Sequence, residues 1–319
     1  LVSDDGLTRT VLRDLDGDRV FELQTSDKTV FNADGSTTLA ISTRDGANKL
    51  LSTRTETISG NGLRVEASSD MDGDGGTDRT TSLVRSADGS SLETTSHYNA
   101  KNDLVQRDVG ATSADGWTVT LERDRDGDGF ADAREVRHVD LSRNVTTTAS
   151  ELADEGTVES ALKIVSSANG LLDVVSLDLD GNGTAEITRT TSHSIDAAGV
   201  RTTVFSETAG DGTLFYREAA RRSANGLTTT TQIDMDGDGA VDETRAEATV
   251  LNADGTQVAT TAIHYANGAL RSASEEVLSA DGRRSQMEMD RDGNGVIDKT
   301  VLTTIGSDGE RITTVHNFD

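Results

Sequence analysis

Six copies of a nine-residue acidic loop recur along this chain at nearly constant spacing. The loops begin at Asp14, Asp70, Asp124, Asp178, Asp234 and Asp290, and successive starts are 56, 54, 54, 56 and 56 residues apart. A period of this length is typical of tandem repeats, in which each supersecondary unit buries its surface against its neighbours. The sequence of 319 residues therefore predicts one continuous repeat array over 1–319.

Each repeat is predicted to contain four short strands joined by tight turns. Dipeptides such as Asp254-Gly255 are strong hairpin signals, because both central residues of a type I′ turn need positive φ. Between the turns lie Thr- and Val-rich segments with period-two alternation, as where Val119 and Leu121 flank Thr120. Alternation separates apolar from polar side chains, so we expect thin sheets with one buried face and one wet face.

Repeat boundaries follow from a Ser-x-x-Gly turn that precedes each acidic loop. Counting from it gives units 3–58, 59–112, 113–166, 167–222, 223–278 and 279–319, the last short by about one strand. We expect an all-β fold, an open and elongated array of antiparallel strands, and a chain that is a fragment of a longer array. The alternative is a six-bladed β-propeller, whose blades are covered on both faces and would need strands apolar on both parities.

Composition narrows the possible partners. Acidic residues outnumber basic ones by 56 to 30, for a net charge of −26, which repels nucleic acid and anionic lipid and attracts divalent cations. The chain has no cysteine and no proline, so disulfides cannot stabilise it, and strand ladders keep all their donors. No apolar run reaches the length of about eighteen residues that a membrane span needs. We expect neither nucleic-acid binding nor membrane insertion.

The acidic loops carry the ligand types that calcium prefers. Calcium takes about six to eight oxygen ligands, and a loop with acids at positions 1, 3 and 5, a carbonyl at 7 and another acid at 9 can wrap one ion. We therefore expect about six structural Ca²⁺ ions. The candidate side chains are Asp14, Asp16, Asp18 and Glu22; Asp70, Asp72, Asp74 and Asp78; Asp124, Asp126, Asp128 and Asp132; Asp178, Asp180, Asn182 and Glu186; Asp234, Asp236, Asp238 and Asp242; and Asp290, Asp292, Asn294 and Asp298, with carbonyls from Val20, Gly76, Phe130, Thr184, Ala240 and Val296.

Position 6 distinguishes the first loop from the others. Five loops place glycine there, which allows the chain to turn sharply around an ion, whereas the first loop has Arg19. An arginine at a position that favours positive φ makes the Asp14 loop the weakest candidate. Asn182 and Asn294 keep an oxygen but lose a charge, so their loops should bind calcium less tightly.

The loops resemble the DxDxDG-xx-D calcium loop of dockerins, thrombospondin repeats and integrin-type FG-GAP propeller repeats. The flanking sequence resembles the YD or RHS repeats of bacterial surface and toxin shells, through runs such as His264-Tyr265-Ala266-Asn267-Gly268-Ala269-Leu270. Together they resemble the repeat arrays of large calcium-dependent proteins of Gram-negative bacteria, including RTX-type adhesins. The resemblance implies a secreted or surface location. The nonapeptide GGxGxDxUx of RTX proper is absent, which argues against the RTX roll fold.

Two classes of function fit these observations. The first is a structural role as stalk, adhesin spacer or filament subunit rigidified by calcium, with open ends that favour self-association into fibres. The second is a propeller that binds a ligand, such as a glycan, and keeps its calcium structural. We expect no enzyme, because the histidines recur at inconsistent positions, except that His97 and His264 correspond, and no catalytic triad is formed.

Overall fold

The computed structural model describes residues 1–318; Asp319, the last residue of the sixth repeat, lies outside this range. The described chain forms strands and turns only, with no helix. It divides into two compact units, one comprising Leu1–Ile164 with Asp178–Gly183, the other Val165–Leu177 and the chain from Thr184 onward. None of the described residues forms a helix long and apolar enough to cross a membrane.

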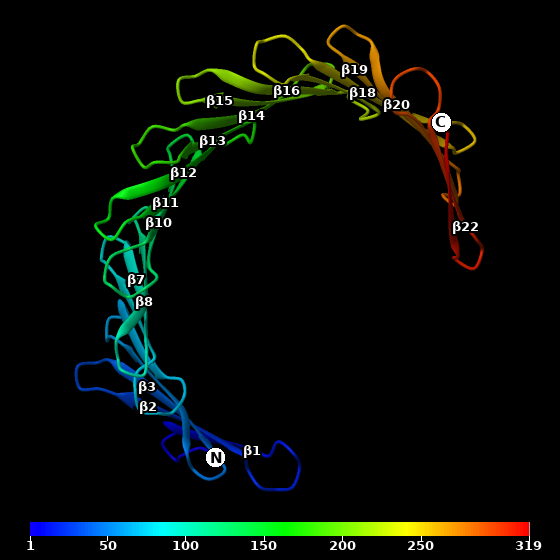
Figure 1. Ribbon diagram of the computed structural model, residues 1–319. Coiled ribbons are helices and arrows are strands. Elements are labelled where there is room, and N and C mark those ends of the chain that lie inside the picture. Colours follow the sequence, from blue (N-terminus) through cyan, green and yellow to red (C-terminus); the bar gives the residue numbers. More distant parts are fainter. Residues whose placement is uncertain (319) are drawn as a thin grey trace. The chain divides into compact units, whose positions relative to one another are not determined.

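Short strands follow one another in chain order, four to each of the first five repeats and three in the sixth (Figure 1). The strands of the first three repeats are β1 (Thr8–Arg13), β2 (Leu23–Phe31), β3 (Thr37–Asp45), β4 (Leu50–Ile58), β5 (Arg64–Asp70), β6 (Arg79–Arg85), β7 (Ser91–Tyr98), β8 (Leu104–Thr112), β9 (Thr118–Asp124), β10 (Ala133–Val139), β11 (Val145–Leu152) and β12 (Val158–Ser166). Those of the last three are β13 (Leu172–Asp178), β14 (Ile187–Ile195), β15 (Arg201–Ala209), β16 (Leu214–Arg222), β17 (Thr228–Asp234), β18 (Glu243–Leu251), β19 (Gln257–Tyr265), β20 (Leu270–Leu278), β21 (Arg284–Asp290), β22 (Lys299–Ile305) and β23 (Arg311–Asn317).

Within each unit the strands form an antiparallel meander. From β1 to β11, and again from β13 to β23, each strand pairs with the next one in the chain. Pairing continues from one repeat to the next, as where β4 of the first repeat pairs with β5 of the second. The expected open, all-β antiparallel array is confirmed. The propeller alternative is wrong, because continuous pairing between repeats leaves no separate blades.

A register shift recurs near the end of the third strand of several repeats. It lies at Thr43/Arg44, His97/Tyr98, Glu207/Thr208 and Ile263/His264. Such β-bulges bend a strand locally, and here they precede the turn next to each acidic loop. In the second repeat the shift follows His97, whereas in the fifth repeat it precedes His264. His97 therefore occupies the same place as Ile263, and the expected correspondence of His97 with His264 is wrong.

The sheet has almost no core, which corrects the expectation of one buried face. Among the described residues, Ala67 and Leu152 alone are buried hydrophobic side chains. The accessible surface is 19621 Å², against about 13,000 Å² expected from the size scaling of folded monomers. The alternation of apolar and polar residues places them on opposite faces of the sheet. The apolar face becomes buried only if a second layer of structure packs on it. Main-chain ladders and turn contacts therefore carry more of the stability than an apolar interior does.

Turns of successive repeats touch one another at the strand ends opposite the acidic loops. A Cβ on Gly89 would lie 3.2 Å from the carbonyl oxygen of Ala114, and one on Gly255 would lie 2.9 Å from Cβ of Ala280. Ala114 and Ala280 are second residues of Ser-x-x-Gly turns. The neighbouring turn therefore leaves little room for a side chain in place of Gly89 or Gly255.

Candidate metal loops

Each acidic loop joins the first and second strands of its repeat. In repeats two to six its first residue is also the last residue of a strand, as with Asp70 in β5 and Asp234 in β17. Strand pairing thereby fixes the first carboxylate before the chain turns. Asp70, Asp124, Asp234 and Asp290 are buried, between 2% and 6% exposed, in a protein with few buried side chains of any kind.

The first carboxylate organises the loop backbone. In the second loop Oδ1 of Asp70 accepts the N–H of Gly73 at 2.6 Å, and Oδ2 accepts that of Gly75 at 2.9 Å. The same two bonds occur at Asp14, Asp124, Asp234 and Asp290. One side chain thus satisfies two loop donors and holds the loop in a closed turn.

The ninth and third acids also accept hydrogen bonds from their own loop. Oδ2 of Asp78 accepts the N–H of Met71 at 2.5 Å, and Oδ1 of Asp72 accepts that of Asp74 at 3.0 Å. Equivalent bonds occur in the first, third, fifth and sixth loops. A carboxylate oxygen has two lone pairs. Each of these oxygens can therefore accept a loop N–H and still contact a cation with its second lone pair.

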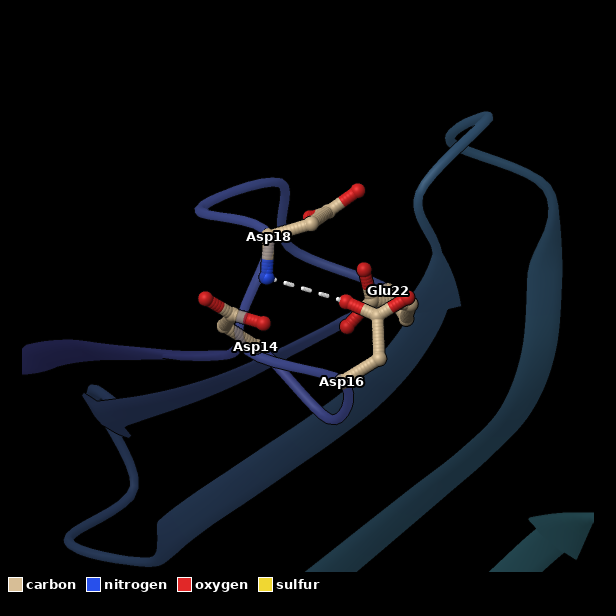
Figure 2. Close-up of side chains that lie close together, drawn as sticks. All are labelled: Asp14, Asp16, Asp18 and Glu22. Carbon is tan, nitrogen blue, oxygen red and sulfur yellow. Dashed lines mark hydrogen bonds between the residues drawn. The ribbon is translucent and has the colours of Figure 1, made fainter.

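Carboxylate oxygens gather within 4.8 Å of one another in the loops. Oxygens on opposite sides of a calcium ion lie about 5 Å apart, twice the usual calcium–oxygen distance. The gathered sets include Asp14, Asp16, Asp18 and Glu22; Asp70, Asp72 and Asp78; Asp124, Asp126 and Asp132; and Asp234, Asp236 and Asp242. Figure 2 shows the first set, with the N–H of Asp18 bonded to Asp16. These groups are geometrically able to hold a metal ion.

The fifth position differs from the other candidate ligands. Asp74, Asp128 and Asp238 lie outside the gathered sets of their loops. Their Oδ1 atoms accept the N–H of the seventh residue instead, as in the 2.7 Å bond from Ala240 to Asp238. Asn294 accepts from Val296 in the same way. In the first loop the fifth residue, Asp18, belongs to the gathered set, and its Oδ1 also accepts the N–H of Val20 at 2.7 Å.

The fourth loop supplies a separate observation on the first carboxylate, Asp178. Oδ2 of Asp178 accepts the N–H of Gly183 at 2.8 Å, but Oδ1 is buried and has no hydrogen-bond partner. A buried carboxylate oxygen without a donor is unfavourable. A divalent cation would compensate it, so this residue fits a metal site. Glu186, in the other compact unit, donates its N–H to the carbonyl of Leu177 at 2.8 Å.

In the sixth loop the backbone stabilises the ionised form of the first carboxylate, Asp290. Burial by itself raises the pKa of Asp290, but the N–H groups of Gly295 and Gly293 and other loop donors together outweigh it, so the pKa lies below the ordinary 3.8. Hydrogen bonds to the charged form stabilise it. At neutral pH Asp290 is therefore an anion, which is the state that binds a metal ion.

Sequence reasoning missed a second essential glycine, at position 4. A Cβ on Gly73 would lie 2.2 Å from the carbonyl oxygen of Leu50 at the start of β4, and Gly127, Gly181, Gly237 and Gly293 meet a strand carbonyl in the same way, at 1.9 to 2.1 Å. Gly17 has no atom within 4 Å among the described residues. The signal was present, since all six loops have glycine at this position.

Arg19 has the backbone conformation that its position demands. Its φ is 72°, in the left-handed region that costs a side chain about 1–2 kcal/mol. The other loops place glycine here with φ between 85° and 100°. The first loop therefore closes at an energetic cost that the others do not have.

No protein-family model and no curated protein matches this chain. Among solved structures, it is similar to a porin-like protein from Bacteroides uniformis, at 11% identity over 92% of this chain and 93% of that one, with a TM-score of 0.18. TcdB2-TccC3 is 10% identical over 100% of this chain but 24% of its own length, with a TM-score of 0.13. Transferrin binding protein B from serogroup B Neisseria meningitidis is 10% identical over 96% and 68%, with a TM-score of 0.15. Scores this low carry no conclusion about this protein.

Proposed function

We propose that this chain is a structural calcium-binding array of a secreted or surface protein, in which one ion per acidic loop stiffens the sheet. The observation that carries the proposal is the gathering of three or four carboxylates at the same turn of successive repeats. The buried, unpartnered oxygen of Asp178 supports it. A coreless sheet needs another source of rigidity, and ion binding supplies it.

Calcium is the metal that this donor set favours. The ligands are carboxylate oxygens without histidine or cysteine, which excludes the usual zinc and copper sets. Magnesium demands a tight octahedral shell with several waters, whereas calcium tolerates the irregular arrangement of a flexible loop. Each ion would be held by the first, third and ninth acids, and it would neutralise like charges that otherwise repel each other.

A location outside the cell fits the composition and the proposed ion. Extracellular modules bind calcium weakly, at about 10⁻⁴ to 10⁻³ M, and such sites fill only where calcium is abundant. The chain has no cysteine, so calcium would take the stabilising role that disulfides have in many secreted proteins. The resemblance of the loops to those of Gram-negative surface proteins supports the same location.

Self-association completes the proposal of a stalk or filament. The edge strand β23 pairs with β22 alone among the described strands, and all seven of its residues are exposed. An edge strand has unpaired backbone N–H and C=O groups, which can pair with a strand of another chain. Light scattering in millimolar calcium should show species larger than a monomer, and a strictly monomeric protein would contradict this part of the proposal.

Direct titration tests the metal site itself. Isothermal titration of calcium into the decalcified chain should give about six sites, with the Asp14 loop the weakest. Asp234→Asn should remove one site and leave the others. As a control, Asp254→Asn changes an acid in a hairpin turn away from the loops and should leave the stoichiometry intact. Absence of binding at millimolar calcium would refute the proposed function.

A further inference from the structure

A groove beside the fifth acidic loop contains side chains that the repeat pattern does not explain. Its volume is about 620 Å³, and it is lined by Met235, Asp236, Asp242, Glu243, Tyr265, Ala266, Asn267 and Arg271. This volume lies within the range of about 300–1,000 Å³ typical of small-ligand pockets. Its two large apolar members, Tyr265 and Met235, are 52% and 49% exposed.

The fifth repeat departs here from the other repeats of 56 residues. Glu243 pairs with Tyr265 across β18 and β19. The corresponding pair is Leu23 with Asp45 in the first repeat and Ile187 with Ala209 in the fourth. Only the fifth repeat has an acid facing an aromatic ring at this place.

Tyr265 also gives up a structural role. It begins a turn in which Gly268 donates its N–H to the carbonyl of Tyr265 at 2.9 Å. In the first repeat Asp45 begins the same turn, and its Oδ1 accepts the N–H groups of Ala47 and Lys49. Tyrosine cannot cap the turn in this way. In the fifth repeat Asn267 caps the turn instead, because its Oδ1 accepts the N–H of Ala269 at 2.9 Å. The position of Tyr265 can therefore carry an exposed aromatic ring without loss of the turn.

An ion pair holds the polar part of the groove in place. Arg271 bonds Glu243, whose side chain is only 12% exposed, and the Arg271 guanidinium lies 5.9 Å from the centroid of the Tyr265 ring. The ring and the guanidinium are thus mutually positioned before any ligand arrives, which lowers the entropic cost of binding. The groove offers an aromatic face, carboxylate acceptors and guanidinium donors in fixed directions.

We propose that this groove binds a neutral saccharide. A sugar ring has an apolar C–H face that packs on an aromatic ring, and hydroxyl groups that both donate and accept hydrogen bonds, which matches Tyr265 beside the Glu243–Arg271 pair. The Arg271 guanidinium already pairs with Glu243, so it offers an acidic sugar little attraction. The inference goes beyond the proposed calcium role, because Tyr265, Glu243 and Arg271 are not among the proposed ligands of the ion.

Saturation-transfer NMR on the full chain tests the proposal. The probes are neutral monosaccharides and disaccharides of glucose, galactose, mannose and N-acetylglucosamine, with glucuronate as the acidic probe and choline as the cationic one. At least one neutral sugar should receive saturation, and Tyr265→Ala should weaken its binding about tenfold, the effect of losing roughly 1.4 kcal/mol of ring contact. Tyr265→Phe should retain most of the affinity.

The matched control is Phe31→Ala, which removes an aromatic side chain that is 70% exposed in the first repeat and should leave sugar binding unchanged. Calcium stoichiometry measured on Tyr265→Ala keeps the two proposals separate, because it should equal that of the unmodified chain. The inference is overturned if no neutral sugar receives saturation, if choline alone does, or if Tyr265→Ala binds sugar as well as the unmodified chain.

Discussion

Replacing the glycine at the fourth position of an acidic loop should destabilise the contact between that loop and the last strand of the preceding repeat. Gly73 has a φ of 77°, and its absent Cβ would lie 2.2 Å from the carbonyl oxygen of Leu50 and 2.6 Å from the carbonyl carbon. Gly73→Ala therefore forces either the loop or the start of β4 to move by roughly 1 Å to reach an ordinary contact distance.

The magnitude follows from two separable costs. Placing alanine in the left-handed region costs about 1–2 kcal/mol. Displacing a packed backbone costs about 1–3 kcal/mol more, by analogy with overpacked interiors. Gly17→Ala provides a matched control, since Gly17 has the same loop position and a φ of 83° but no atom within 4 Å. The control should incur the first cost alone.

Native-state hydrogen exchange is the suitable assay, because a repeat array opens locally and one global unfolding energy is not well defined. In excess chelator, Gly73→Ala should accelerate exchange of β4 and β5 amides by about tenfold or more beyond the effect of Gly17→Ala on β1 and β2, since 1.4 kcal/mol corresponds to a factor of ten. Equal acceleration in the two variants would refute the role assigned to the Leu50 contact.

Three further predictions concern the loops and turns. Arg19→Gly should relieve the left-handed backbone, stabilise the first hairpin by about 1 kcal/mol and raise the calcium affinity of its loop, as measured by melting temperature and calorimetry; a lower melting temperature would contradict it. Asp238→Ala should weaken calcium binding at the fifth loop less than Asp234→Ala, because Asp238 lies outside the gathered set; titration calorimetry with the reverse order would contradict it. The Thr256 hydroxyl and then its backbone N–H hold the pKa of Asp254 below the ordinary 3.8, so the stability that this carboxylate contributes is present above about pH 4 and is lost as pH falls through the lower folded pKa. Melting curves between pH 5 and 3 in chelator should therefore show a smaller loss for Asp254→Asn than for the unmodified chain, and an equal loss would count against the turn bond.

The strand order was predictable because its signals are local. Turn dipeptides such as Asp254-Gly255 mark hairpin ends, and Gly255 has a φ of 86°. The expected type I′ geometry is wrong for this turn, because Asp254 does not share the positive φ that type I′ needs at both residues. The acidic loops were predictable for the same reason, since the period and the ligand spacing both lie in the chain itself. The sequence also indicated the backbone strain at Arg19, because the other five loops have glycine at the equivalent position.

The layering of the sheet was not predictable from alternation. Val119 lies on the apolar parity of its strand but is 38% exposed, because no second layer covers that face. A period of two specifies which side a residue faces, and it does not specify whether anything packs there. The contacts of Gly73 and of Ala280 were missed for a related reason: each depends on a neighbouring repeat whose backbone approaches from outside the local segment.

Thermal melting with and without calcium tests the central claim most directly. Circular dichroism melts of the full chain, recorded in excess EDTA and in millimolar calcium, should show a higher melting temperature with calcium, because an ion that binds the folded loop alone stabilises it by mass action. The gain should shrink when the first acid is replaced in several loops together, and excess magnesium should not reproduce it. An identical melting curve in EDTA and in calcium would contradict the account, since the acidic loops would then be turns without a metal.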